Sequence, residues 1–216
     1  MSNCCCSCDL PVAVITGVHP FDVPSFHHLF RALPGIDAYI QDVENFALDW
    51  GKCRADYGAA VFYNMHPGAP PEGAVENALL GMGEAGQGIV ILHHAILAWP
   101  DWEPWGEITG LRDRGFRYFM DQQLRVDVAD GAHPITEGLA PFDLLDETYT
   151  MAEPGGDSRV LLTTEHQPSM HSLAWTRQYG ASRVFCLQLG HDARAWNDAN
   201  FQQILSRGIL WTSGKL

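Results

Sequence analysis

The chain has 216 residues, a length typical of one domain. Its 13 basic and 26 acidic residues give a formal net charge of −13, which argues against nucleic acids and anionic membranes as partners, because both need a basic face. Hydrophobic residues make up 46% and charged residues 18% of the chain, a composition that supports a buried core and excludes a disordered or fibrous chain. Ten histidines and seven tryptophans stand out beside so few lysines and arginines.

Short apolar runs and helical periodicities alternate along the first half of the chain. Continuous apolar runs predict four buried strands, at 10–15, 36–43, 58–63 and 88–92. Between them, Phe26, Leu29, Phe30 and Leu33 recur at helical spacing before Pro34-Gly35, and residues 75–82 repeat the pattern. Strands that alternate with helices in this way predict βαβ units, a mostly parallel sheet and helices on both of its faces.

The alternation lapses over residues 99–131, which we interpret as an insertion. Further strands are predicted at 124–128, 142–149, 160–164, 172–176 and 184–189. The last helix is expected to begin after Asp198, whose side chain can cap it, and to end before Gly214. The pattern therefore predicts a single α/β domain over residues 10–216.

Four of the six cysteines fall close together, at Cys4, Cys5, Cys6 and Cys8, in a segment predicted to be a flexible tail over residues 1–9. Adjacent cysteines suit a tetrahedral zinc site poorly, because structural zinc sites space their ligands as C-x₂₋₄-C pairs. The sequence shows neither a signal peptide nor an apolar run long enough to cross a membrane. We therefore expect a cytoplasmic protein with no membrane partner.

Six of the ten histidines follow predicted strands: His19, His66, His93, His94, His166 and His191. In open α/β sheets, ligands bind beyond the carboxyl ends of the strands, so these side chains are expected to gather at one edge of the sheet. Imidazole is both a common metal ligand and a proton carrier near neutral pH. Each histidine alone is explained by a hydrogen-bonded position in the core or a loop, but the joint pattern favours a site.

Tryptophans and acidic residues alternate just after His93 and His94. Trp99, Trp102 and Trp105 are spaced by three, with Asp101 between the first two. An indole face beside carboxylates suits a sugar, which has an apolar C–H face and a rim of hydroxyls, whereas a hydrophobic cover over the insertion is the alternative. Glu147, near the end of a predicted strand, either faces the same pocket or is a solvated carboxylate at a turn.

Ordered motifs along the chain resemble a known family. They read GIVILHHA at 88–95, AWPDW at 98–102, WGEITG at 105–110, HPITEG at 133–138, DETY at 146–149, RVF at 183–185 and LGHD at 189–192, followed by Trp196 and residues 201–214. Together they resemble the trehalose-utilization (ThuA-like) family over about residues 10–214. The resemblance implies the fold of class I glutamine amidotransferases, a flavodoxin-like three-layer sandwich around a mostly parallel sheet. It also implies a role in disaccharide breakdown beside a dehydrogenase that oxidises the sugar to a 3-keto derivative.

The amidotransferases themselves place a cysteine on a strained turn after a central strand and activate it with a later histidine. The corresponding turn here, 92–95, reads LHHA and offers no thiol or hydroxyl, and neither Cys53 nor Cys186 is placed to replace one. Without a nucleophile there is no covalent acyl step, so we do not expect amidotransferase activity. The pair His191-Asp192 lies where the partner histidine is expected.

The first functional hypothesis is an enzyme for an oxidised sugar, because a 3-keto group acidifies the neighbouring C–H. His93 or His94 is the candidate base and His191, held by Asp192, the candidate acid, in an isomerisation, elimination or hydrolysis. A divalent metal such as Zn, bound by His19, by His93 or His94, and by His191, would stabilise an enolate.

The remaining candidates concern substrate and partners. Trp99 and Trp102 are expected to form a sugar platform, Asp101 and Glu147 to bond hydroxyls, and Trp196 to contact the substrate. The second hypothesis is a non-catalytic sugar-binding or accessory subunit that forms a homo-oligomer or binds a sugar dehydrogenase. A third is redox or metal handling by the cysteines of the tail.

Overall fold

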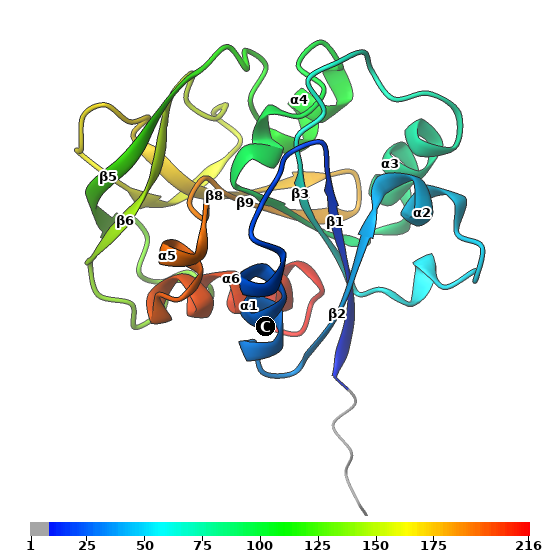
Figure 1. The fold of residues 1–216 in the computed structure, drawn as a ribbon, viewed down its shortest axis with the longest axis horizontal. Coiled ribbons are helices and arrows are strands. Elements are labelled where there is room, and N and C mark those ends of the chain that lie inside the picture. The colour runs from blue at the N-terminus through cyan, green and yellow to red at the C-terminus, as the bar shows by residue number, and fades with distance from the viewer. Residues whose placement is uncertain (1–8) are drawn as a thin grey trace, which may run out of the picture.

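The computed structural model describes residues 9–216, which build one nine-stranded mixed sheet (Figure 1). The strands are ordered β2-β1-β3-β4-β9-β8-β7-β5-β6. Their bounds are β1 Leu10–Gly17, β2 Ile36–Asp42, β3 Ala59–Asn64, β4 Gly88–Leu92, β5 Arg117–Val128, β6 Phe142–Thr150, β7 Arg159–Thr163, β8 Ser172–Tyr179 and β9 Ser182–Leu187. Strands β2, β1, β3, β4 and β9 pair in parallel, and the remaining pairings are antiparallel. The cysteines of the predicted tail lie outside the described residues.

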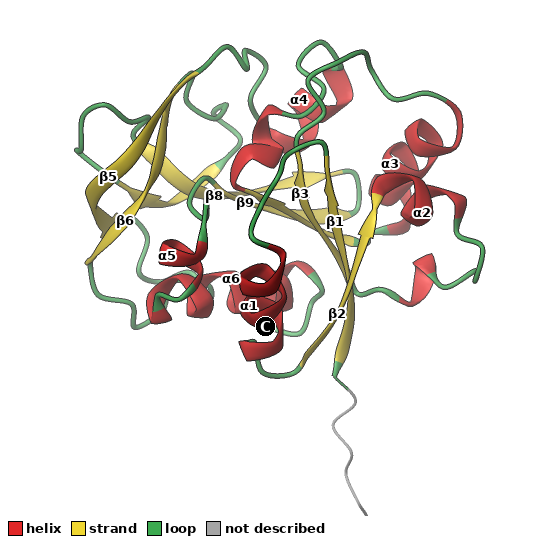
Figure 2. Cartoon of the chain, viewed as in Figure 1, coloured by secondary structure: helices red, strands yellow, loops and turns green. Residues whose placement is uncertain are grey.

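Helices cover both faces of this sheet and give three layers (Figure 2). One face carries α1 (Val23–Ala32), α5 (Ala193–Trp196) and α6 (Ala199–Thr212), and the other carries α2 (Val43–Leu48), α3 (Gly73–Ala85) and α4 (Glu103–Thr109). Strand β1 is buried on both sides, because Val12 and Val14 join the first core whereas Ala13 and Ile15 join the second. The predicted α/β sandwich around a largely parallel core is confirmed.

Residues 99–131 are more regular than their sequence indicates. They contain α4 and the whole of the long strand β5, which pairs with β6 as an antiparallel ribbon. The ribbon changes register between Phe119 and Gln122, where Asp121 adopts a φ of 56°. The exposed side of β5 carries Tyr118 and Met120, so the strand lacks the buried alternation that would have revealed it.

Helix α6 supports the two strands, β4 and β9, that carry the site described below. The Asp198 side chain accepts hydrogen bonds from the N–H groups of Asn200 at 2.8 Å and Phe201 at 3.0 Å, as predicted for its cap. Gly208 lets the helix approach β9, because a Cβ there would lie 2.2 Å from the Phe185 ring. None of the helices in residues 9–216 is long and apolar enough to span a membrane. The cytoplasmic location stays a prediction.

Candidate functional site

The turn after β4 holds a histidine in an unusual backbone conformation. His93 has a φ of 53°, a left-handed value that few residues other than glycine adopt, and it begins a 3₁₀ helix over His93–Leu97. Its Nδ1 lies 2.6 Å from the carbonyl oxygen of Gln188, just beyond β9. Because a carbonyl oxygen only accepts hydrogen bonds, Nδ1 carries the hydrogen, and in the neutral ring Nε2 keeps its lone pair.

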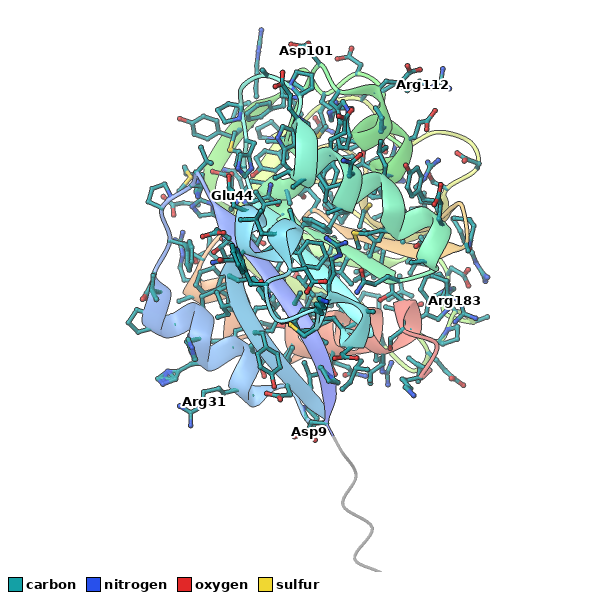
Figure 3. All side chains as sticks on the ribbon, turned by 90° about the vertical axis from the view of Figure 1, so that its right-hand side faces the viewer. Asp9, Arg31, Glu44, Asp101, Arg112 and Arg183 are labelled. Atoms are coloured by element: carbon teal, nitrogen blue, oxygen red, sulfur yellow. The ribbon has the colours of Figure 1, made fainter. Side chains whose placement is uncertain are left out.

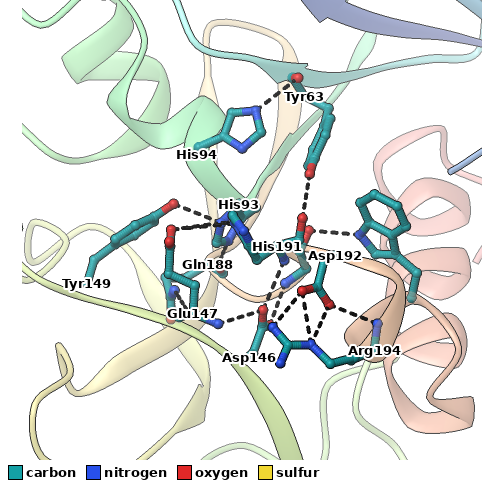
Figure 4. A network of polar contacts seen from close by, with 12 residues as sticks. Tyr63, His93, His94, Asp146, Glu147, Tyr149, Gln188, His191, Asp192 and Arg194 are labelled. Atoms are coloured by element: carbon teal, nitrogen blue, oxygen red, sulfur yellow. Dashed lines mark hydrogen bonds and ion pairs between the residues drawn. The ribbon is translucent and has the colours of Figure 1, made fainter. Parts of the chain in front are cut away.

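Two further side chains, from β6 and from the loop after β9, lie close to this Nε2 (Figure 4). His93 Nε2 lies 3.2 Å from His191 Nδ1 and 3.3 Å from Glu147 Oε1, and the last two atoms lie 3.6 Å apart. We call His93, Glu147 and His191 the triad. The hydroxyl of Tyr149 lies 2.8 Å from the same Nε2. Glu147 and Tyr149 reach the site together because alternate residues of β6 share one face.

Burial and charge set the protonation states around the triad. Burial acts to raise the pKa of Glu147, but its hydrogen bond with His93 and the charge of that ring outweigh the effect and lower the pKa overall. Burial and the neighbouring His93 lower the pKa of His191. Burial and the carboxylate of Glu147 hold the pKa of Tyr149 well above its usual value. Near neutral pH the site thus contains a carboxylate, a neutral imidazole and a phenol that stays protonated.

Asp146 fixes the chain beside the triad from the opposite side of β6. Its buried carboxylate accepts the backbone N–H groups of Gly190 at 2.6 Å, His191 at 2.9 Å and Glu147 at 2.9 Å. Burial raises the pKa of Asp146, while the charge of His93 and these N–H donors act against that rise. Sequence reasoning placed Asp146 in a family motif but assigned it no role, although its position next to Glu147 on a strand puts it on the other face.

A cavity of about 300 Å³ opens beside the triad. Polar and apolar side chains both line it: His19, His94, Glu147, Tyr149 and His191 together with Met65, Leu97, Phe116, Tyr118 and Met120. The rings of His19 and His191 have their centroids 6.1 Å apart. The aromatic side chains on the ribbon were not predicted as site residues, and Tyr118 is 61% exposed.

Two further imidazoles stack at the cavity wall. His19 and His94 have ring centroids 4.2 Å apart with an angle of 28° between their planes. His94 is buried and directs Nε2 at the carbonyl oxygen of Tyr63, and burial beside other imidazoles lowers its pKa to about 2. Burial, followed by the charges of His191 and His93, also lowers the pKa of His19. His94 is thus a buried, weakly basic imidazole that stacks on His19, and the predicted role of His93 or His94 as the base stays a prediction.

The ThuA family model, described as trehalose utilisation, matches residues 48–212. The chain belongs to the ThuA family. Membership suggests a sugar-related role. Comparison with curated proteins found no significant match.

Solved structures agree with this assignment at the level of the fold. A ThuA-like protein from Parabacteroides merdae is 22% identical with a TM-score of 0.77, and the match covers 96% of this chain and 91% of that one. A ThuA-like protein from Bacteroides uniformis is 19% identical with a TM-score of 0.77, over 98% and 94% of the two chains. A glutamine amidotransferase from Thermotoga maritima is 10% identical with a TM-score of 0.53, over 95% and 98%. The resemblance inferred from the motifs is therefore confirmed.

The predicted sugar platform of this ThuA protein lies in the core instead of the cavity. Trp99 and Trp102 are only 3% and 6% exposed, because they pack in the apolar layer under α4. The buried guanidinium of Arg114 binds the backbone carbonyls of both residues, at 2.6 and 3.1 Å, and so fixes the segment between them. Asp101 points outward at the surface (Figure 3). The exposed aromatic wall is formed by Phe116 and Tyr118.

Asp192 and Trp196 hold the backbone near the triad but do not line the cavity. Asp192 Oδ2 lies 2.6 Å from Arg194 Nη2, and its Oδ1 accepts the Arg194 backbone N–H at the start of α5. The ring of His191 is therefore oriented by His93 and Glu147 rather than by Asp192. Trp196 is buried and donates its indole N–H to the Gly190 carbonyl oxygen at 2.8 Å.

The remaining predicted histidines, His19, His66 and His166, lie outside the triad. His66 stacks on Trp99 with centroids 4.9 Å apart and contacts Asn64. His166 contacts the side chain of Gln122 on β5 and does not line the cavity. His19 lines the cavity but is not part of the triad, where Glu147 takes the position expected for a third histidine ligand.

No cysteine in the described part of the ThuA chain reaches the turn at His93. Cys186 lies buried within β9, where burial raises the pKa of its thiol, and Cys53 is exposed near Tyr57. The turn that would carry a nucleophile by resemblance carries an imidazole instead. The site can accept a proton at His19, donate a hydrogen bond from Tyr149, and hold a proton or a cation within the triad.

Proposed function

We propose that this ThuA protein is an enzyme that removes a proton next to the ketone of an oxidised sugar. The observation that carries the proposal is that His19, Tyr149 and His191 line one cavity, with the hydroxyl of Tyr149 2.8 Å from His93 Nε2. Enolisation requires a base and a hydrogen-bond donor in one pocket, and His19 and Tyr149 supply these two groups. Family membership supports a sugar as the substrate class.

The walls of the cavity suit one sugar ring. Its volume of about 300 Å³ lies at the lower end of small-molecule sites, so one ring of a disaccharide fits and the second ring extends toward solvent. Phe116 and Tyr118 on the ribbon offer apolar surface to the C–H face of a ring. Glu147, which also lines the cavity, offers a carboxylate to hydroxyl groups.

The proposed chemistry begins with proton transfer to His19. His19 takes the proton from the carbon next to the ketone, the C–H electron pair forms a C=C bond, and the carbonyl electrons move onto oxygen. The O–H group of Tyr149 hydrogen-bonds the negative oxygen and stabilises it. In an elimination, the enolate re-forms its C=O bond, the C=C electrons expel the glycosidic oxygen from the adjoining carbon, and His19 returns its proton to that oxygen. In an isomerisation, the former carbonyl carbon takes a proton and the neighbouring hydroxyl loses one.

The test uses exchange of the substrate proton, because exchange reports enolisation even without net turnover. The protein is incubated with 3-keto-trehalose in deuterated water, and loss of the C–H signal next to the ketone is followed by NMR. We expect exchange by the native protein and a loss of at least about 100-fold in His19→Asn, since a positioned base contributes about 10²–10⁴-fold. His166→Asn, which lies outside the cavity, is the matched control and keeps the native rate. Absence of both exchange and product with the native protein would falsify the proposal.

An accessory role is the second candidate, favoured by the exposed apolar side chains of the ribbon. Phe116, Tyr118 and Met120 are 36%, 61% and 41% exposed beside the cavity, and β6 next to them is an edge strand of the sheet. Such a patch is typical of a contact surface for a second copy or for a sugar dehydrogenase. Light scattering of the protein alone and mixed with the dehydrogenase tests this role, and a strictly monomeric protein without a complex contradicts it.

A further inference from the structure

We infer that the triad binds one divalent transition-metal ion, with an open coordination position toward the cavity. The inference concerns the site of the proposed function, but it is tested without any sugar. A failure to bind metal is therefore distinguishable from a failure to enolise a substrate.

The spacing of the three triad atoms is the spacing of metal ligands. His93 Nε2, His191 Nδ1 and Glu147 Oε1 form a triangle with sides of 3.2, 3.3 and 3.6 Å. An ion bound tetrahedrally by histidine nitrogen and carboxylate oxygen at about 2.0–2.2 Å separates its ligand atoms by about 3.3–3.6 Å. The side chains therefore need no rearrangement of the strands to accept an ion.

The hydrogen bonds of His93 leave a lone pair facing a carboxylate. Its Nδ1 hydrogen is directed at the Gln188 carbonyl, so Nε2 of the neutral ring presents its lone pair to the Tyr149 hydroxyl at 2.8 Å and to Glu147 Oε1 at 3.3 Å. The single hydrogen of the Tyr149 hydroxyl can be donated to only one of the two acceptors, His93 Nε2 and Glu147 Oε1, at a time, which leaves the other without a donor. A metal ion satisfies all three atoms at once, whereas a hydrogen on His191 Nδ1 lies 3.2 and 3.6 Å from its two acceptors and serves neither at close range.

Neighbouring groups fix the ring of His93 and the backbones of the other two ligands. Gln188 fixes the ring of His93 through its carbonyl oxygen, and its side-chain Nε2 donates to the backbone carbonyl of Glu147 at 3.0 Å. Asp146 holds the backbone of His191. Histidine ligands in metal sites typically donate their second ring N–H to a carbonyl or carboxylate, as His93 does here.

Two histidines and one carboxylate are the ligand set of catalytic zinc sites and of facial non-haem iron sites, which keep positions open for water or substrate. Glu147 and His191 line the cavity, so the open position of the triad faces it. A metal ion there would act as a Lewis acid on a ketone oxygen, in the cavity that His19 and Tyr149 also line.

The first experiment measures metal binding by the full chain. The protein is stripped with a chelator and titrated by calorimetry with Zn²⁺, Mn²⁺ and Co²⁺, and the visible spectrum of the Co²⁺ form reports its ligands. We expect one ion per chain. Glu147→Gln and His191→Asn should each weaken binding by more than about 100-fold, since even partners outside the ligand shell account for about 10–100-fold. His166→Asn should bind as the native protein does.

A second variant separates the triad from the cysteines near the N-terminus. Cys4, Cys5, Cys6 and Cys8 are replaced together by serine in the full chain, which should keep its one ion and its Co²⁺ spectrum. The inference is overturned if the native protein binds no ion, which is the result expected if the triad holds a proton instead of a metal ion. It is equally overturned if the serine variant loses the ion while Glu147→Gln and His191→Asn retain it. Thermal unfolding shows whether each variant is folded. If Glu147→Gln does not fold, His191→Asn alone tests the loss of metal binding.

Discussion

Asp146 Oδ1 accepts the backbone N–H of His191 at 2.9 Å, so a carboxylate on one face of β6 sets the position of an imidazole that meets Glu147 on the other face. Two adjacent residues of one strand thus act on the same partner, one through its backbone and one through its ring. Asp146 touches no part of the cavity and is a positioning residue.

Replacing Asp146→Asn should destabilise the fold and displace His191. The amide keeps the shape of the side chain but turns one acceptor into a donor that faces a backbone N–H, so we expect a loss of about 1–3 kcal/mol in the free energy of unfolding. Urea denaturation measures this loss. Asp143→Asn on the same strand is the control, because Asp143 is exposed and should change stability by less than about 0.5 kcal/mol. Equal effects of the two variants would contradict the positioning role.

Tyr149→Phe should reduce turnover while leaving the fold intact. The phenol lies 2.8 Å from His93 Nε2 and stays protonated because burial and Glu147 raise its pKa. Removing a donor to a developing oxyanion lowers kcat by about 10²–10³-fold in other enzymes, and we expect a loss of this order with a small change in KM. Steady-state kinetics on a 3-keto-glycoside measures both parameters. An unchanged kcat would remove Tyr149 from the proposed chemistry.

The ribbon and the buried tryptophans should respond to substitution in opposite ways. Tyr118→Ala removes an exposed ring, so we expect KM to rise by roughly tenfold or less and stability to change by less than about 0.5 kcal/mol. Trp99→Ala removes a buried ring and should cost about 3–5 kcal/mol of stability. Thermal unfolding and sugar-binding calorimetry distinguish the two. A stable Trp99→Ala variant with weakened sugar binding would restore the platform predicted from the sequence.

His133 makes stability depend on pH at a point far from the triad. Its Nδ1 accepts the Ile135 backbone N–H at 3.2 Å, and burial, then Arg159, lowers its pKa below the usual 6.5. The unfolded chain therefore binds a proton first, so stability is lost as the pH falls below about 6.5 toward the lower folded-state pKa. We expect His133→Gln to reduce the slope of the unfolding free energy over this range by up to about 1.4 kcal/mol per pH unit. An unchanged slope in urea denaturation would contradict this account.

The strands that meet at the site can be predicted from the local sequence, but the residues that line the cavity cannot. Continuous apolar runs identify β1, β3, β4 and β9, and the rule that ligands gather at the carboxyl ends of parallel strands brings His93 and His191 together. That Glu147 faces them follows from the alternation of side chains along β6, once β6 is known to pair with β5.

Contacts between residues far apart in the sequence decide whether an aromatic side chain lies in the core or lines the cavity. A run of spaced tryptophans is the same in a core layer and in a sugar platform, since both require apolar contact. Arg114 binds the backbone carbonyls of Trp99 and Trp102 although it is more than ten residues away from both in the chain. The spacing of residues in the sequence does not predict such contacts. Likewise, Tyr118 reaches the cavity only because β5 pairs with β6 and shifts register beyond it.

The left-handed backbone at His93 fixes the direction in which the side chain points, whereas the residue type at this position fixes its chemistry. The turn directs the residue at position 93 toward the ends of β6 and β9 whatever that residue is, provided the surrounding layers hold its conformation. The chemistry available at this place therefore depends on which residues occupy positions 93, 147 and 191, and the fold alone does not set it. In such a fold, inheritance of the scaffold and inheritance of the reaction are independent.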